Sequence, residues 1–202
     1  MKKIFIENLE QTRFFRYMID KGGLTPENLY KLRDYFHFRS VPTNSYLLQA
    51  GEICRYIFFV EEGLLINQTL NERGQERIIH IAPENWILTD RSSLYFSEPS
   101  EFFIKSIEDS IVVYLHEDYN RHATELSSVY GCFVNDSLQR NIYTQEKRIQ
   151  SLLSMTAKER YLAFLERYPD TTQRIPQWMI ASYLGITPES LSRVRREIAG
   201  EY

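Results

Sequence analysis

The chain has 202 residues, enough for one large domain or two small ones with a sizeable core. Its hydrophobic fraction of 43% and charged fraction of 25% exclude a disordered chain, a collagen and a coiled-coil rod. The formal net charge of -3 hides an asymmetry: residues 138–202 contain 10 Lys or Arg and 7 Asp or Glu, hence +3, which leaves -6 on residues 1–137. A basic C-terminal part on an acidic body is a first indication of function.

The cysteines and the apolar runs restrict the cellular setting. Cys54 and Cys132 are too few for a zinc or iron–sulfur site within one chain, and we expect buried, reduced thiols rather than a disulfide framework. The longest apolar run, Ile111–Leu115, is far shorter than the roughly 20 residues of a membrane span. Glu7 interrupts the apolar stretch behind the first two lysines, which argues against a signal peptide. We expect a cytoplasmic protein without a membrane partner and without a metal.

The first half of the chain changes from helical to strand patterning. The first 35 residues have helical spacing and are divided by Gly22-Gly23 and Pro26, which predicts two short helices. From Phe38 to Leu115, short β-rich runs alternate with turn residues. These runs are SYLLQ, RYIFFVE, LLINQTL, ERIIHIA, WILT, FFIKSI and SIVVYL. Seven strands at roughly ten-residue spacing predict an antiparallel sandwich or barrel, because there is no room for the helical crossovers of a parallel sheet.

The pattern becomes helical again from Glu117. Apolar residues at steps of three and four predict one long helix over about 117–153. Its apolar stripe could pack on the barrel or form a dimer seam, and we favour the dimer because the helix outruns the domain before it. Ser154-Met155 then reads as a hinge. Thr156 and Glu159 have the spacing of a capping box, which starts a further helix that ends near Tyr168.

The last 27 residues predict a helix-turn-helix. Pro176 suits a helix start, Gly185 suits a left-handed helix end, and Thr187-Pro188 can cap and start the second helix. On that helix Leu191, Val194 and Ile198 form an inward stripe. Ser190, Arg193 and Arg196 are predicted to face outward, where arginine can bind guanine and serine can donate to phosphate. Two terminal helices with a solvated charged face are the alternative.

The order of barrel, long helix, hinge, helix and helix-turn-helix resembles the Crp/Fnr family of bacterial transcription regulators over nearly the whole chain. The segment IASYLGITPESLSRVRR resembles the helix-turn-helix of that family, ERYLAFLERYP the helix before it, and GEICRYIFFVEEGLLINQ its second and third barrel strands. The resemblance implies an α+β protein: an N-terminal antiparallel, jelly-roll-like β-roll of the cyclic-nucleotide-binding type, a long dimerisation helix, and a C-terminal winged-helix-like helix-turn-helix. It places an effector-binding-like domain at 1–153 and a DNA-binding domain at 154–202.

The resemblance also implies that a homodimer binds double-stranded DNA at an inverted-repeat operator, and RNA polymerase is a further expected partner. Glu189 and Arg193 match base-reading positions of the family, and Gln177 matches a phosphate-contacting position. Pro188 stands where the family has its earlier base-reading arginine, so a different half-site is expected. The expected DNA-binding residues are Gln177, Thr187, Glu189, Ser190, Arg193 and Arg196.

The effector pocket departs from the pattern that the family uses for cyclic nucleotides. Leu88-Thr89 stands in place of Gly-Glu, and Ser100-Glu101 stands in place of the phosphate-binding arginine and its neighbour. A carboxylate there would repel the phosphate, so cyclic AMP is not expected. An unidentified small ligand could still bind, or aromatic side chains such as those of Trp86, Tyr95, Phe102 and Phe103 could fill the pocket. The candidate pocket residues are Thr89, Arg91, Ser100 and Thr144, the last of which matches a base-facing position of the family.

Catalysis is not expected, and no catalytic residue is predicted. None of the motifs GxGxxG, GxxxxGK[ST], HExxH or GxSxG occurs in the chain. The remaining alternative is a ligand-binding sensor that acts through protein–protein contacts, with the terminal helices as its docking face.

Overall fold

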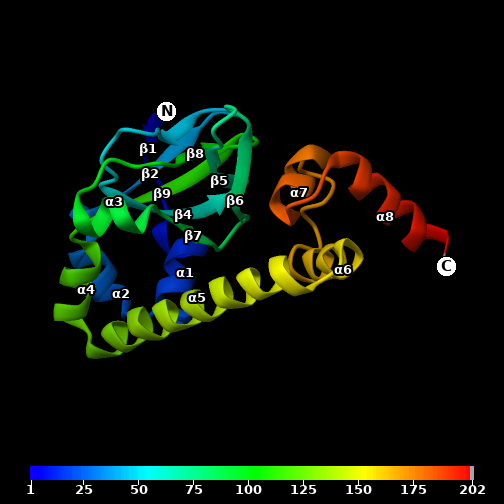
Figure 1. The fold of residues 1–202 in the computed structure, drawn as a ribbon. Helices are drawn as coiled ribbons and strands as arrows, with labels where there is room; N and C mark the ends of the chain where they lie inside the picture. The colour runs from blue at the N-terminus through cyan, green and yellow to red at the C-terminus, as the bar shows by residue number, and fades with distance from the viewer. Residues whose placement is uncertain (201–202) are drawn as a thin grey trace. The chain divides into compact units, whose positions relative to one another are not determined.

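The computed structural model describes residues 1–200. The chain divides into two compact units (Figure 1). Unit 1 comprises residues 1–67 and 81–139, and unit 2 comprises residues 68–80 and 140–202. The division falls within the long helix α5 (Ser128–Ser154). Each unit is described by itself below.

Two antiparallel sheets form the β-rich part of the chain. The five-stranded sheet has the order β1-β2-β9-β4-β7, and the four-stranded sheet has the order β3-β8-β5-β6. The strand bounds are β1 (Lys2–Ile4), β2 (Phe36–Val41), β3 (Tyr46–Leu48), β4 (Tyr56–Glu62), β5 (Leu65–Leu70), β6 (Glu76–Ala82), β7 (Ile87–Leu88), β8 (Phe103–Ser106) and β9 (Ser110–His116). All seven strands expected from the sequence are present.

Strand β9 is the centre of the five-stranded sheet because both of its neighbours pair with it. Phe38 of β2 lies opposite Val113, and Phe58 of β4 lies opposite Tyr114. Val112, Val113, Tyr114 and Leu115 are all buried, so this strand is covered on both faces. A continuous apolar run is the pattern of such a strand, whereas a half-exposed strand alternates.

The two faces of the sheet pack against different cores. One core lies between the sheets and consists mainly of aliphatic side chains, with Phe58 and Tyr114 as its large members. The other core joins the opposite face to α1 (Arg13–Asp20) and the start of α5. Tyr17 of α1 contacts Phe59 of β4 at 5.2 Å and Phe133 of α5 at 6.0 Å between ring centroids. Helix α1 therefore lies between the sheet and α5 (Figure 1).

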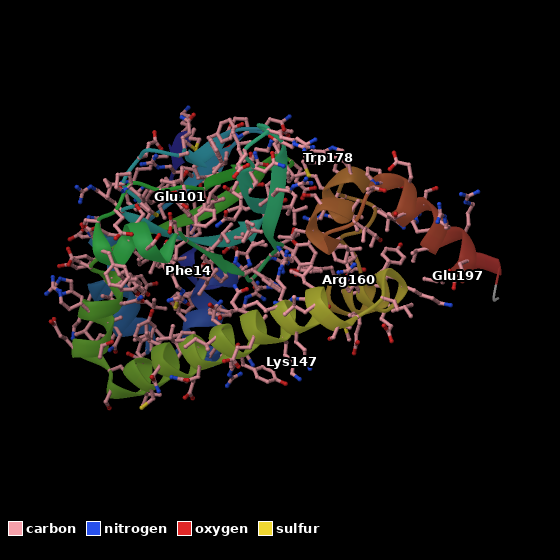
Figure 2. The ribbon with its side chains drawn as sticks, in the orientation of Figure 1. Phe14, Glu101, Lys147, Arg160, Trp178 and Glu197 are labelled. Carbon is pink, nitrogen blue, oxygen red and sulfur yellow. The ribbon has the colours of Figure 1, made fainter. Side chains whose placement is uncertain are left out.

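Phe14 belongs to the second core, where its ring packs against several other aromatic rings (Figure 2). It is fully buried, and its ring centroid lies 4.9 Å from that of Phe36 and 5.5 Å from that of Phe59. Removal of a buried phenyl ring leaves a cavity and typically costs about 3–5 kcal/mol. We expect Phe14→Ala to lower the free energy of unfolding by that amount in chemical denaturation. Phe5, which is 78% exposed, supplies the control, and Phe5→Ala should change it by less than about 0.5 kcal/mol.

The structure adds elements to those expected in the first half of the chain. The two expected helices are present as α1 and α2 (Pro26–Lys31), and single 3-10 turns occur at Leu9–Gln11 and Arg33–Tyr35. Strands β1 and β2 were not expected. Neither was α3 (Arg91–Phe96), whose N-cap Asp90 accepts hydrogen bonds from the backbone N–H groups of Ser92 and Ser93. Arg91, expected in a loop, is therefore the first residue of a short helix.

The prediction of a single helix over 117–153 is wrong, because the helix is interrupted at Ser127. The segment forms two helices, α4 (Tyr119–Leu126) and α5, separated by Ser127 in an extended conformation. The Ser127 hydroxyl donates to the carbonyl of Gly23 at 3.3 Å and accepts from the backbone N–H of Tyr130 at 3.3 Å. A serine that offers local hydrogen bonds favours a helix start over a helix interior, which explains the break.

The C-terminal half of the chain is helical. Helix α5 is followed by α6 (Ala157–Arg167), α7 (Gln177–Leu184) and α8 (Pro188–Gly200). The capping box is present: the Thr156 hydroxyl accepts from the Glu159 N–H, and the Glu159 carboxylate accepts from the Thr156 N–H at 2.8 Å. The winged-helix-like expectation holds for the three helices, while residues 157–200 contain no strand that could form a wing.

Candidate nucleic-acid interface

Helices α7 and α8 meet over a tight turn at Gly185. Gly185 has φ 68°, in the left-handed region that favours glycine. Its N–H donates to the carbonyls of Ala181 and Ser182, and the Ile186 N–H donates to Ala181 at 3.0 Å. These bonds satisfy the last carbonyls of α7 and turn the chain within three residues.

Helix α8 begins where the sequence predicts, at Thr187 and Pro188. Thr187 is the residue before the helix, and its hydroxyl accepts from the Ser190 N–H at 3.2 Å. Pro188 is the first helical residue, where its fixed φ suits the helix and its missing N–H is not required. The Thr187 hydroxyl therefore acts as the N-cap of α8.

The inward face of α8 packs on α6 and α7. Leu191 is fully buried, Val194 is 7% exposed, and Ile198 is half-buried at the next turn. Their partners in the small core of unit 2 include Phe164 of α6 and Leu184 of α7, which are both buried. Lys158 of α6 also forms an ion pair with Glu197 of α8 at 3.0 Å (Figure 2). Glu197 is therefore held by the domain itself.

The opposite face of α8 carries polar and basic side chains. Glu189, Arg193 and Arg196 are exposed and follow one another at steps of four and three, so they share this face. The pKa of Glu189 lies below its usual value, because its own backbone N–H and then the Thr187 hydroxyl donate hydrogen bonds to the carboxylate. Glu189 is consequently an ionised acceptor at neutral pH.

Two positions on α8 differ from the sequence interpretation. Ser190, expected to face outward, is half-buried, and its hydroxyl oxygen lies 3.2 Å from that of Thr187. Ser192 is exposed and lies three residues after Glu189, so it belongs to the outward face although it was not selected. The three-residue spacing was the signal that could have identified it. Gln177 is exposed at the first turn of α7, as a phosphate contact requires.

The four candidate effector residues are divided between the two units. Thr144 belongs to unit 2, whereas Thr89, Arg91 and Ser100 belong to unit 1. The Thr89 hydroxyl donates to the Tyr56 carbonyl at 3.0 Å, and the Ser100 hydroxyl donates to the Phe102 carbonyl at 3.1 Å. Both hydroxyl protons are therefore engaged by the backbone. Arg91 is exposed.

The interior between the two sheets is occupied by the side chains of the chain itself. Leu48, Phe58, Leu65, Ile104 and Tyr114 are all at most 3% exposed there. Burial raises the pKa of Tyr114 to about 12, so its phenol stays neutral. The space between the sheets is largely a packed core whose aromatic members are Phe58 and Tyr114. Of the aromatic residues expected to fill it, Trp86 packs against this core, whereas Tyr95 is exposed and the expectation is wrong for it.

Within residues 1–200, no cluster of three or more His, Cys, Asp or Glu side chains has the arrangement of a metal site. Cys54 is a buried free thiol, as expected, whereas Cys132 is a free thiol that is exposed, so the expectation of burial is wrong for it. In the same part of the chain, no helix is long and apolar enough to cross a bilayer.

The arrangement of a β sandwich, a long helix and a terminal helix-turn-helix recurs in solved structures. FixK2 from Bradyrhizobium japonicum is 18% identical, with a TM-score of 0.68 over 81% of this chain and 84% of that one. The c-di-GMP responsive global regulator CLP of Xanthomonas campestris is 11% identical, with a TM-score of 0.67 over 88% and 93% of the two chains. A protein described as a transcriptional regulator of the Crp/Fnr family, from Eubacterium rectale, is 17% identical, with a TM-score of 0.66 over 89% and 85%.

This chain has the fold of the Crp/Fnr regulators. Neither a protein-family model nor a curated protein matches its sequence. In the Crp/Fnr fold the β-roll comes first, the long helix second and the helix-turn-helix last, which is the order found here. The resemblance inferred from the sequence is therefore confirmed at the level of the fold.

Proposed function

We propose that this protein is a sequence-specific DNA-binding transcription regulator of the Crp/Fnr type. The observation that carries the proposal is the outward face of α8, where ionised Glu189 and the exposed Arg193 and Arg196 follow a capped helix start. Arginine can bind O6 and N7 of guanine, and a carboxylate can accept from N4 of cytosine. Gln177, Thr187 and Ser190, at the two helix starts, then contact the DNA backbone.

The exposed stripe of α5 supports a homodimer. Leu138, Ile142, Ile149 and Leu152 are between 37% and 58% exposed, and with Gln145 they follow one another at alternating steps of four and three. This is the spacing of a coiled-coil seam. Burial of such a stripe removes apolar surface from water, which a second copy of α5 can achieve. Two recognition helices related by a two-fold axis then read an inverted repeat with half-sites about 34 Å apart.

Residues 1–153 then act as the sensor part and residues 154–202 as the DNA-binding part, with RNA polymerase as the expected downstream partner. The charge distribution supports this division, because the net positive charge lies in residues 138–202. A basic region near the recognition helix attracts phosphate, and an acidic sensor does not.

The operator is the direct test of this function. We expect purified protein to select a palindromic sequence from random duplex DNA, and to shift that duplex in a gel at concentrations that leave scrambled duplex free. Selection with and without a cell extract shows whether a small ligand improves binding. Failure to enrich any sequence under both conditions, with retention of a protein partner in a pull-down, would favour a sensor that acts through protein contacts.

Cyclic AMP is not expected to be the effector. Ser100 and Glu101 stand where the phosphate-binding arginine would be required, and the Ser100 hydroxyl already donates to the Phe102 carbonyl. A carboxylate near a cyclic phosphate is repulsive. In isothermal titration calorimetry we expect a Kd for cyclic AMP weaker than about 1 mM, which corresponds to less than about 4 kcal/mol of binding free energy. A micromolar Kd would contradict this prediction.

A further inference from the structure

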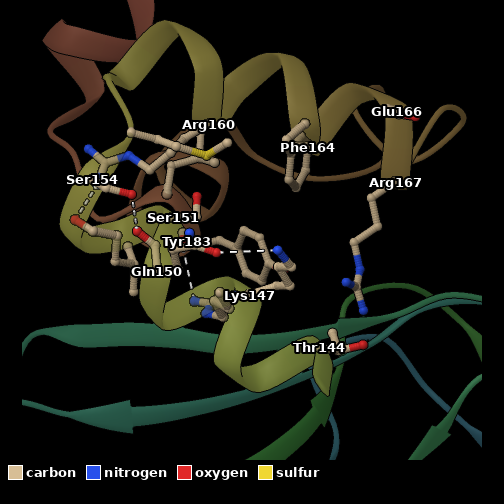
Figure 3. Close-up of a pocket in the computed structure, with 15 residues that line it drawn as sticks. Thr144, Lys147, Gln150, Ser151, Ser154, Arg160, Phe164, Glu166, Arg167 and Tyr183 are labelled. Atoms are coloured by element: carbon tan, nitrogen blue, oxygen red, sulfur yellow. Dashed lines mark hydrogen bonds between the residues drawn. The ribbon is translucent and has the colours of Figure 1, made fainter. Parts of the chain in front are cut away.

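Unit 2 contains a cavity of about 610 Å³ that is lined by α5, α6 and α7 (Figure 3). The lining residues of α5 include Thr144, Arg148 and Ser151, and those of α6 include Arg160, Phe164 and Arg167. In each set the members are three, four or seven residues apart, so each helix presents one continuous face. The volume lies within the range of about 300–1,000 Å³ that is typical of small-molecule sites.

The lining combines an apolar wall with an excess of positive charge. Leu152 and Met155, which are exposed, supply the apolar surface, and the buried Phe164 and Leu184 complete the lining. The basic members are Lys147, Arg148, Arg160 and Arg167, whereas Glu166 is the single acidic residue of the lining. An apolar pocket with a few convergent polar groups is the usual form of a ligand site, and the charge here favours an anion.

Arg148 has bonding capacity that the protein does not use. One of its terminal nitrogens, Nη2, donates to the carbonyl of Tyr183 at 3.1 Å, and the guanidinium carbon lies 3.8 Å from the centre of the Tyr183 ring. The other terminal nitrogen, Nη1, is buried and has no hydrogen-bond partner among the described residues. A buried donor left unpaired costs about 1–3 kcal/mol, and more when it is charged.

Arg160 repeats this situation on the opposite helix. Its Nη1 atom donates to the Leu152 carbonyl at 3.2 Å, which holds the side chain against the end of α5. Its Nε atom is buried and, within residues 1–200, has no hydrogen-bond partner. Two arginines from two helices therefore line one cavity, and the unpaired nitrogen of each is itself shielded from solvent. A guanidinium keeps its proton in proteins, so the two side chains give the lining a permanent positive charge.

The dimer seam does not account for the cavity. With 3.6 residues per turn, the face of α5 that carries Thr144, Arg148 and Ser151 lies roughly 130° around the helix from the stripe of Ile142 and Ile149. A second copy of α5 on that stripe therefore covers part of Leu152, which belongs to both the stripe and the lining, and leaves the face of Thr144, Arg148 and Ser151 open. A ligand that fits the cavity has a negatively charged group that accepts hydrogen bonds, and an apolar part.

We propose that this cavity binds a small amphipathic organic anion, with its carboxylate, sulfonate or phosphate group among the basic side chains of the lining, Arg148 and Arg160 included, and its apolar body on Leu152 and Met155. The site lies in unit 2 and shares only Thr144 with the pocket expected from the sequence. Because its walls are the end of α5 and two helices of the DNA-binding part, its occupation holds these helices in one arrangement. This regulatory consequence rests on the proposed function, whereas the ligand site does not.

The test uses the full chain and a pair of fluorescent dyes. Anilinonaphthalene sulfonate has an aromatic body and one negative charge, and phenylnaphthylamine is its neutral counterpart. We expect a saturable site for the sulfonate with a Kd at least tenfold lower than that of the neutral dye. Arg148→Met and Arg160→Met should each weaken sulfonate binding at least tenfold and leave binding of the neutral dye unchanged.

Two further variants make the outcome decisive. Arg140→Met removes the same charge from α5 at a residue outside the lining, and it should keep wild-type affinity. Ala163→Trp fills the cavity without removal of a charge, so it should abolish sulfonate binding even if an arginine variant fails to fold. Wild-type affinity in Ala163→Trp, equal affinity for the two dyes, or equal losses in Arg140→Met and Arg148→Met would each overturn the site.

A gel shift with the selected operator separates this proposal from the function. If the dye results hold and the sulfonate changes operator affinity, both parts are supported. If they hold and operator affinity is unchanged, the regulatory consequence is refuted and the site stands. If they hold and no operator can be selected, the proposed function fails independently of the site.

Discussion

Arg193→Ala is expected to remove operator preference while weak binding to any duplex remains. Arg193 is exposed on the outward face of α8, between Glu189 and Arg196. A bidentate arginine–guanine contact contributes about 2 kcal/mol of discrimination, or roughly 30-fold per half-site and about 1,000-fold over a two-fold-symmetric dimer. Phosphate contacts are independent of sequence and persist. Competition gel shifts with operator and scrambled duplex measure the ratio directly.

Arg195 provides a matched control on the same helix. It is exposed, but it follows Val194 and lies toward the packed side of α8, so it does not share the face of Glu189 and Arg196. Arg195→Ala removes the same charge and should reduce affinity for operator and scrambled duplex alike, with a shallower salt dependence. Retention of full operator preference in Arg193→Ala, or an equal loss of preference in both variants, would remove Arg193 from the base-reading set.

Ile149→Glu is expected to convert the dimer into a monomer and to weaken operator binding about 100- to 10,000-fold. Ile149 is 58% exposed in the single chain and lies in the middle of the proposed seam. A carboxylate buried between two helices without a partner is strongly unfavourable. In a dimer, binding of one protomer to its half-site raises the effective concentration of the other protomer's DNA-binding part at the second half-site, and a monomer lacks this effect. Light scattering after size-exclusion chromatography reports the mass, and gel shifts report the affinity.

Gln139→Glu is the control for this variant. Gln139 is exposed on α5 about a quarter of a turn from the seam, and the substitution adds the same charge. It should leave both the mass and the operator affinity unchanged. A dimer of unchanged affinity in Ile149→Glu would show that the exposed stripe of α5 is not the seam.

Helix caps and turns were predicted correctly from the sequence, because each depends on residues that are close together in the chain. Gly185, Thr187 and Pro188 each prefer one backbone role, and the structure places each in it. The capping box of Thr156 and Glu159 is equally local. The seven expected strands had clear β-rich runs bounded by turn residues, which made their existence predictable although not their pairing.

Elements that depend on tertiary contacts were missed. Strand β2 begins at Phe36, within a pattern that also suits a helix, and its pairing with β9 decides the outcome. The break between α4 and α5 depends on Ser127 and on the distant Gly23 carbonyl. The cavity of unit 2 was not predictable because its walls come from three helices, and the unpaired nitrogens of Arg148 and Arg160 become visible only when their neighbours are placed.

The junction between α5 and α6 closes each helix with local bonds. The Ser154 hydroxyl donates to the Gln150 carbonyl at 2.7 Å and the Met155 N–H donates to Ser151 at 3.1 Å, while Thr156 and Glu159 satisfy the start of α6. A rotation about the backbone at Met155 therefore breaks none of these hydrogen bonds. It does break the bond from Arg160 Nη1 to the Leu152 carbonyl, which spans the joint. Substitution of Arg160 is thus a way to loosen this joint while the hydrogen bonds within both helices stay intact.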